Sequence, residues 1–246
     1  MSYRIATWNL DHASRSNRPI PAQMEEMQRI NADILVLTET CKKVNLSSRY
    51  PFSVASKPNK YGKHYSTIWS KWQITKPIDT YDGETSTCAL VDGPLGNVLV
   101  YGTIIAYHGF KAKESGTWVE HHKEIGLCGD DWFRIQQDFP GIPLIVAGDF
   151  NQTRDGSRKY CSSQSIELLD KQIERNNLVC LTEEDFGKAG KLNIDKNKGR
   201  YRQNVDHICI SKDRFLVDYV GAWDHFTASQ ELSDHNGVYV DISVRS

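Results

Sequence analysis

The feature that most constrains this chain is a set of short apolar runs that end in acidic, amide or imidazole side chains. In the segment PLIVAGDFNQTRDG (143–156) the run 144–147 is followed by a glycine and then by Asp149, Phe150 and Asn151. Apolar runs of this length, bounded by turn residues, predict buried β-strands. Residues two apart on an extended backbone point the same way, so we expect both polar side chains to project together while Phe150 packs inward.

The same pattern recurs along the chain, and its order reverses near the C-terminus. Strands are predicted over 3–8, 34–37, 97–107, 144–147, 208–210 and 237–244, with weaker candidates between 65 and 91. The polar residues beside these strands are Asn9, Asp11, Glu39, His108, Asp149, Asn151, Asp206, Asp234 and His235. They follow the early strands and precede the late ones. We therefore expect them to meet at one edge if the late strands run antiparallel to the early ones.

Helical patterns lie between some of these strands. Apolar spacing predicts a helix from Pro21 through Ile30, one over 118–139 that is interrupted near Gly129, and one around Leu169 that ends at Asn176. Several strands follow one another without a helix, which favours mixed sheets flanked by helices, an α/β or α+β fold, over a parallel barrel. The chain has no composition shift, repeat or low-complexity block, so we expect a single domain over residues 1–246.

Composition limits the classes of partner. The net charge is −1, so any binding of nucleic acid requires a local basic patch. No apolar stretch approaches the roughly 18–20 residues of a membrane span, and the first residues do not resemble a signal peptide. The six cysteines are scattered without a CxxC pair, which favours reduced thiols in the cytoplasm. We expect a monomer that does not bind membranes.

So many carboxylates at one edge predict a bound cation. Clustered acidic groups repel one another and have shifted pKa values unless a positive charge neutralises them. Carboxylate and amide oxygens with few imidazoles suit a hard ion, Mg²⁺ or Mn²⁺, better than zinc. Such an ion in an acidic cleft is what the hydrolysis of phosphate esters requires.

Six motifs in order along the chain carry a family resemblance. TWNLD, LTE, AYH, GDFN, VDHI and SDHNG, which lie between residues 7 and 237, resemble the endonuclease/exonuclease/phosphatase superfamily with its DNase I-like fold. The resemblance spans nearly the whole chain. It implies a four-layer α/β/β/α sandwich of two mixed β-sheets flanked by helices, with the active site at one rim of the sheets.

The resemblance also implies a metal site. Glu39 would be the chief metal ligand, with Asn9, Asp11 and Asp234 close to the ion or to an alternative ion position. Asn9 would also contact the substrate. Schemes with one metal ion and with two are both compatible with these residues.

The same resemblance suggests roles for the reacting groups. Asp149 would orient or activate the attacking water, and Asn151 would hold the phosphate or the Asp149 geometry. His235 would contact the scissile phosphate or act as base, with Asp206 fixing its tautomer. His108 would donate a proton or a hydrogen bond to a phosphoryl or leaving oxygen. The sequence leaves the identity of the general base open.

Two basic segments flank these motifs. Lys198, Arg200 and Arg202 belong to a lysine- and arginine-rich stretch that leads into the VDHI motif, and Tyr201 within it could stack on a base. Arg154 follows GDFN and is expected on the same rim. The stretch is read either as a phosphate-binding arm or as a solvated loop. Five further histidines, His64, His121, His122, His207 and His225, are expected at the surface rather than as ligands.

The leading interpretation is a Mg²⁺-dependent phosphodiesterase, most simply a nuclease that acts on DNA or RNA. The alternative is a hydrolase of a small phosphorylated molecule or lipid head group, such as an inositol phosphate or sphingomyelin. A non-catalytic binding module is disfavoured because every expected polar position is occupied. TWNLD together with SDHNG is also similar to the tyrosyl-DNA phosphodiesterase branch of the superfamily.

Overall fold

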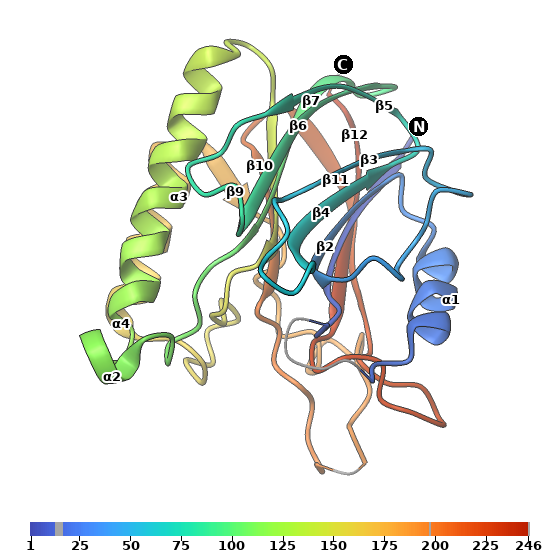
Figure 1. Ribbon diagram of the computed structural model, residues 1–246, viewed down its shortest axis with the longest axis vertical. Helices are drawn as coiled ribbons and strands as arrows, with labels where there is room; N and C mark the ends of the chain where they lie inside the picture. Colours follow the sequence, from blue (N-terminus) through green and yellow to red (C-terminus); the bar gives the residue numbers. More distant parts are fainter. Residues whose placement is uncertain (13–16, 197, 246) are drawn as a thin grey trace.

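Two mixed β-sheets packed face to face form the centre of the protein (Figure 1). The computed structural model describes residues 1–12, 17–196 and 198–245. Within these residues the first six-stranded sheet has the order β11 (Phe215–Trp223), β12 (Gly237–Val244), β1 (Tyr3–Asn9), β2 (Ile34–Thr40), β4 (His64–Ser70), β3 (Phe52–Ala55). The second has the order β5 (Gln73–Ile78), β6 (Ser86–Gly93), β7 (Gly96–Ile104), β8 (Leu144–Asp149), β10 (Asp206–Ser211), β9 (Leu178–Cys180).

Strand direction brings the late polar residues back to the early ones. β1 runs parallel to β2, and β7 runs parallel to β8. The late strands are antiparallel to their partners: β12 pairs with β1, and β10 pairs with β8 so that Asp206 lies opposite Asp149. The start of each late strand therefore lies beside the end of an early one, which is the arrangement that the reversed motif order requires.

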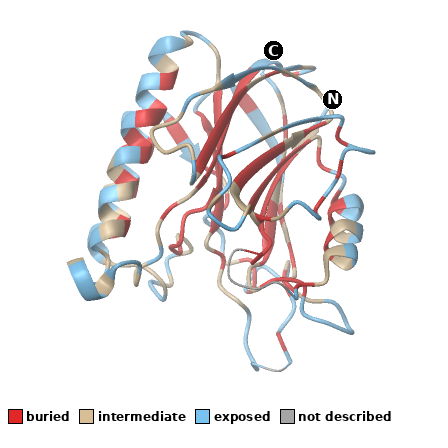
Figure 2. Ribbon diagram, viewed as in Figure 1, coloured by how far each residue is buried: buried red, intermediate tan, exposed pale blue. Residues whose placement is uncertain are grey.

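Three apolar clusters define four layers. The central cluster includes Val36, Ala147 and Val240 from facing strands and fills the space between the sheets. Helix α1 (Ile20–Ile30) packs Met27 and Ile30 against the outer face of the first sheet. Helices α3 (Val119–Asp138) and α4 (Ser163–Arg175) cover the second sheet. Buried residues accordingly follow the strands and the inward helix faces (Figure 2). The four-layer α/β/β/α sandwich of mixed sheets is confirmed.

Helix α3 is continuous, so the predicted interruption near Gly129 is wrong. The glycine serves helix packing: a Cβ at this position would lie 2.1 Å from the Gln172 Oε1 atom of α4. A glycine inside a helix costs only about 1 kcal/mol relative to alanine, and here the close approach of α4 to α3 compensates for it. The absence of a side chain at Gly129 thus reflects tertiary contact rather than a helix end.

The predicted strand 97–107 is too long at its C-terminal end. β7 ends at Ile104, and the next residues form a loop that leads to the short helix α2 (Ala112–Ser115). The Ile105 N–H still donates to the carbonyl of Asp149, 2.9 Å away, so the loop starts along β8. His108 consequently lies four residues beyond the strand, and neighbouring loops decide its position.

Two further expectations concern the state of the cysteines and the possibility of a membrane span. All six cysteines are free thiols, and Cys88, Cys128, Cys180 and Cys209 are buried. Among the residues that the structure describes, no helix has both the length and the apolar character that a membrane crossing requires.

Candidate active site

The polar strand ends border one large pocket at the rim of the two sheets. The pocket has a volume of about 1410 Å³, and its lining includes Glu39 from β2, Asp149 and Asn151 at the end of β8, and Asp234 and His235 before β12. Five of the nine polar residues that the sequence places beside the strands thus share one cavity. Strand pairing fixes the backbones of Glu39 and Asp149, whereas Asn151, Asp234 and His235 lie in the adjoining loops.

Asp149 is the most firmly held carboxylate of the pocket. Its Oδ2 atom accepts hydrogen bonds from the side-chain amides of Asn9 and Asn151, each at 3.0 Å, and its Oδ1 accepts the backbone N–H of Asn151 at 2.8 Å. Burial raises the pKa of Asp149 above its usual range, and the positive charge of His235 opposes this shift. Asp149 is therefore oriented for one direction of approach and is more basic than an exposed carboxylate.

A turn, and not the alternation of side chains along an extended strand, brings the side chains of Asp149 and Asn151 together. Asn151 has φ 50°, in the left-handed region, and its amide also donates to the carbonyl of Ile105 at 2.8 Å. The two polar side chains do lie together, but the expected extended backbone is wrong for Asn151. Phe150 is fully buried, as predicted, and its ring lies 6.3 Å from that of Trp132.

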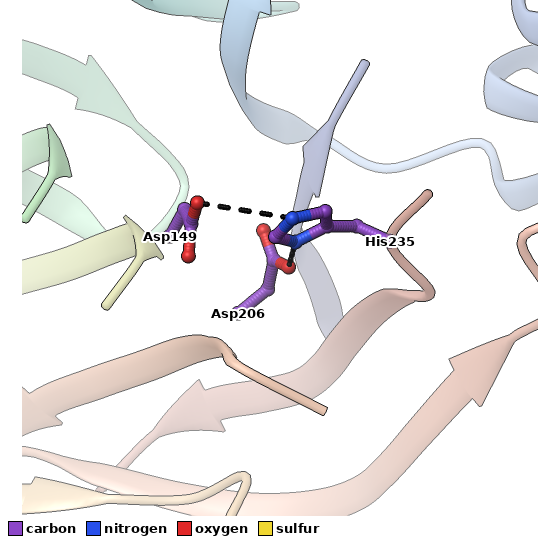
Figure 3. Close-up of side chains that lie close together, drawn as sticks. All are labelled: Asp149, Asp206 and His235. Carbon is purple, nitrogen blue, oxygen red and sulfur yellow. Dashed lines mark hydrogen bonds and ion pairs between the residues drawn. The ribbon is translucent and has the colours of Figure 1, made fainter. Parts of the chain in front are cut away.

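His235 bridges two carboxylates (Figure 3). Its Nδ1 lies 2.6 Å from Asp206 Oδ2, and its Nε2 lies 4.0 Å from Asp149 Oδ2. Burial by itself lowers the pKa of His235, but the negative charges of Asp206 and Asp149 outweigh this effect and raise it to about 10. The ring is thus an imidazolium at neutral pH, with both nitrogens protonated and facing acids.

Two residues fix the loop that carries His235: Ser233 of the same motif and Trp8 of β1. The indole Nε1 of Trp8 donates to the carbonyl of His235 at 2.7 Å. Ser233 donates through its hydroxyl to the carbonyl of Asn9 at 2.6 Å and accepts the N–H of His235 at 3.1 Å. Ser233 is not among the predicted site residues, although its place at the start of SDHNG is a signal that could have identified it.

Glu39 contributes the carboxylate of the first sheet. It lies at the end of β2 with φ 50°, and its Oε1 accepts a hydrogen bond from the Asn9 amide at 3.2 Å. Asn9 therefore joins Glu39 to Asp149 across the two sheets. Burial raises the pKa of Glu39, while the hydrogen bond from Asn9 and the charge of His235 lower it.

The structure brings Asp234 to the pocket but pairs Asp11 elsewhere. Asp234 lines the cavity, and its Oδ2 lies 3.6 Å from an Nη of Arg202. Asp11 is buried, and its Oδ2 accepts a hydrogen bond from the Nε of Arg18 at 2.9 Å. An arginine thus neutralises Asp11, which does not belong to the pocket lining.

Of the four basic residues expected at the site, three line the pocket and one does not. Lys198, Arg200 and Arg202 line the pocket, as does Tyr201, which is 38% exposed. Arg154 does not reach this pocket: its guanidinium donates to Asp170 of α4 and to Glu183, which follows β9. The expectation that Arg154 shares the rim is wrong, because two acids, distant in sequence, hold its side chain away from the site.

His108 lies beside the pocket but not in its lining. Its Nδ1 lies 3.0 Å from the hydroxyl oxygen of Tyr160, and it is Tyr160 that lines the cavity. Tyr160 is not among the predicted site residues. No motif marks it, and only the folding of the loop after Asn151 brings it to the site.

Three histidines that we expected at the surface are buried: His121, His207 and His225. His121 bonds the carbonyl of Ala106 at 2.6 Å, and His207 bonds the Thr182 hydroxyl at 3.1 Å. The surface expectation is wrong for these three because backbone and hydroxyl partners satisfy the imidazoles inside the fold.

Gly148 fixes the position of Asp149, and its replacement is a test of the fold. Its φ is +143°, and an added Cβ would lie 1.9 Å from the Thr103 carbonyl oxygen of β7. We expect Gly148→Ala to lower the free energy of unfolding by well over about 1 kcal/mol, because backbone strain and a backbone clash add. Gly96→Ala is the control: it has φ +75° but open space, so it adds strain alone. Chemical denaturation measures both, and equal losses would contradict the clash.

Sequence comparison identifies the family. The sequence model of the endonuclease/exonuclease/phosphatase family matches residues 6–235. The chain belongs to this family. It is therefore a hydrolytic phosphoesterase of a divalent-metal-dependent class. The ligand atoms of Asp149, Asp206 and His235 lie within 4.8 Å of one another, but the protonated His235 ring has no free nitrogen for a metal ion.

Solved structures of the same family share the fold. An endonuclease/exonuclease/phosphatase family protein from Bacteroides thetaiotaomicron is 15% identical, with a TM-score of 0.69 and coverage of 100% of this chain and 99% of that one. The endonuclease domain of TRAS1, a telomere-specific non-LTR retrotransposon, is 16% identical, with a TM-score of 0.67 and full coverage of both chains. D. rerio TDP2, solved with a single-strand DNA product, is 13% identical, with a TM-score of 0.69 and 99% coverage of each. At these identities the likeness establishes the fold alone. Among curated proteins, no sequence matches this chain.

Proposed function

We propose that this protein is a Mg²⁺- or Mn²⁺-dependent phosphodiesterase that cuts a polynucleotide. One observation carries the proposal: the pocket that holds Glu39, Asp149 and His235 is also lined by Lys198, Arg200 and Arg202. An acidic centre with adjoining basic residues suits a polyanion that is bound along its backbone and hydrolysed with a metal. The six free cysteines suit a reducing compartment, for which we propose the cytoplasm.

The donor set fits a hard divalent cation. Glu39 and Asp234 line the cavity with carboxylate oxygens, and burial raises the pKa of Glu39, so a cation beside it would offset unfavourable negative charge. We assign Glu39 and Asp234 as ligands with Asn9 close by, and we withdraw Asp11 because Arg18 already neutralises it. The ion, when bound, would offset charge on the phosphoryl oxygens.

The geometry divides the remaining roles between Asp149 and His235. Asp149, held by three hydrogen bonds and made more basic by burial, would take a proton from the attacking water. The oxygen of that water bonds to phosphorus while the bond to the ester oxygen breaks, and the leaving alkoxide takes up a proton from solvent, which yields an alcohol and a phosphate monoester. His235 is a cation at neutral pH, so we assign it to the scissile phosphate rather than to the base.

The size of the pocket favours a polymer over a small phosphoester. Sites for small molecules enclose roughly 300–1,000 Å³, and this cavity has about 1410 Å³. Its lining extends from Glu39 to the basic residues and to the ring of Tyr201, on which a base could stack. That D. rerio TDP2 was solved with a DNA strand supports a nucleic acid over an inositol phosphate or a lipid head group.

A substrate panel tests the proposal. The protein is incubated with Mg²⁺ or Mn²⁺ and labelled single-stranded DNA, duplex DNA, RNA, an inositol phosphate and sphingomyelin. We expect metal-dependent cleavage of at least one polynucleotide and none with EDTA. Turnover of the inositol phosphate or sphingomyelin alone would transfer the assignment to the alternative class.

Neutralising the basic lining residues should weaken polynucleotide binding. For the triple variant Lys198→Gln, Arg200→Gln and Arg202→Gln we expect lower affinity and a flatter salt dependence. Each lost phosphate contact reduces the slope of log K against log salt by about 0.7–0.9. Fluorescence anisotropy in EDTA measures binding without cleavage.

A matched control uses three basic residues at the far end of the second and first sheets. Lys212→Gln, Arg214→Gln and Arg245→Gln remove the same charge from exposed positions outside the pocket. We expect this variant to retain the wild-type slope. Equal slopes for both triple variants would show that binding depends on overall charge and not on the pocket.

A further inference from the structure

Tyr160 occupies the place in the pocket that the sequence pattern gives to His108. Tyr160 lines the cavity together with Asp149, Asn151 and His235, whereas His108 does not. The His108 ring lies behind the phenol, with its Nδ1 3.0 Å from the Tyr160 hydroxyl oxygen. A substrate in this cavity therefore meets the phenol before it meets the imidazole.

The phenol is held in place from two sides. Its backbone pairs with Thr153, two residues beyond Asn151: the Thr153 N–H donates to the Tyr160 carbonyl at 2.8 Å. The His108 ring meets the Tyr160 ring edge-on, with 5.1 Å between the ring centroids. The Trp118 ring also contacts His108, with 5.3 Å between the centroids. The loop after β7 and the loop after β8 are thus joined at this pair, which restricts the phenol to one orientation.

The surroundings keep the phenol protonated. Burial raises the pKa of Tyr160 to about 12, the charge of Asp149 adds to this shift, and the charge of Arg202 opposes it. The hydroxyl therefore lies within electrostatic range of both the proposed base and the basic lining. At neutral pH it is a neutral group with one proton to donate.

We propose that the Tyr160 hydroxyl donates a hydrogen bond to an oxygen of the reacting phosphodiester and that His108 acts through it as a positioning residue. The assignment requires the His108 tautomer with its proton on Nδ1, which donates to the phenol oxygen 3.0 Å away and leaves the phenol proton free to face the pocket. This assignment rests on the proposed phosphodiesterase function and adds to it a donor outside the six sequence motifs.

A double-mutant cycle tests the assignment. Tyr160→Phe removes the hydroxyl and keeps the ring, and His108→Ala removes the group behind it. With a metal-dependent oligonucleotide substrate, we expect each change to lower kcat about 10- to 100-fold with a smaller change in KM. We expect the double variant to be no slower than Tyr160→Phe, because His108 acts only through the phenol. His108→Asn, which can still donate to the phenol, should recover part of the lost rate.

The control is Tyr107→Phe, the same change at a pocket-lining tyrosine beside His108. It should leave kcat within about twofold of wild type, and thermal melting should show that all variants fold. Wild-type turnover in Tyr160→Phe, or multiplied losses in the double variant, would overturn the assignment while the proposed function stands. Absence of any phosphodiester hydrolysis by the wild-type protein would instead overturn the proposed function and this assignment together.

Discussion

Replacement of Glu39 by glutamine should abolish metal-dependent hydrolysis while the fold stays intact. The change keeps the size of the side chain and its acceptor for the Asn9 amide but removes the negative charge that faces the cavity. A bound metal ion supplies several kcal/mol of transition-state stabilisation, so we expect kcat/KM to fall by about a thousandfold or more. Turnover at several Mg²⁺ concentrations, together with the rise in melting temperature on adding Mg²⁺, measures the effect.

Glu124 offers a matched control in the same pocket. It also lines the cavity, burial likewise raises its pKa, and its Oε2 accepts the N–H of Ala106 at 2.6 Å. Glu124→Gln keeps this acceptor, so we expect nearly normal turnover. If Glu39→Gln and Glu124→Gln behaved alike, with Mg²⁺ still raising the melting temperature of the Glu39 variant, the metal assignment would have to be abandoned.

The second large effect concerns the His235–Asp206 pair. His235→Ala removes the cation that faces the scissile phosphate, and we expect kcat to fall by about 10²–10³-fold. In the wild type, His235 Nδ1 lies 2.6 Å from Asp206 Oδ2. Asp206→Asn keeps an oxygen that can accept from Nδ1 but removes the charge that stabilises the imidazolium. Its effect should therefore depend strongly on pH.

The sign of that pH dependence follows from the raised pKa of His235. With a pKa of about 10 the imidazolium is present throughout neutral pH, and on the alkaline side activity should fall only as the pH rises through about 10. Asp206→Asn removes one of the charges that raise this pKa, so the alkaline fall should move to lower pH. Profiles of kcat/KM from pH 6 to 10.5 measure the shift. A fall at the same pH in both proteins would mean that His235 is not the group that titrates.

Part of this protein could be predicted from local patterns. The runs at 144–147 and 237–244 are short, apolar and bounded by turn residues, so they form strands in almost any context. The polar residues at their ends then meet because sheet pairing places strand termini side by side, as the pairing of Asp149 with Asp206 shows. Helix α4 likewise follows from its apolar spacing and ends where Asn176 was expected to stop it.

The sequence by itself therefore determined mixed sheets flanked by helices and the convergence of Glu39, Asp149 and His235 on one pocket, and the family resemblance of its motifs implied the four-layer sandwich. Only the tertiary structure decided which polar groups near that pocket face it. Arg18 neutralises Asp11, Asp170 and Glu183 hold Arg154 away, and the Tyr160 phenol lines the pocket where His108 does not. Strand ends are fixed by periodic hydrogen bonding, which leaves a local trace in the sequence. The direction of a loop side chain depends on partners from distant segments, and no spacing along the chain records them.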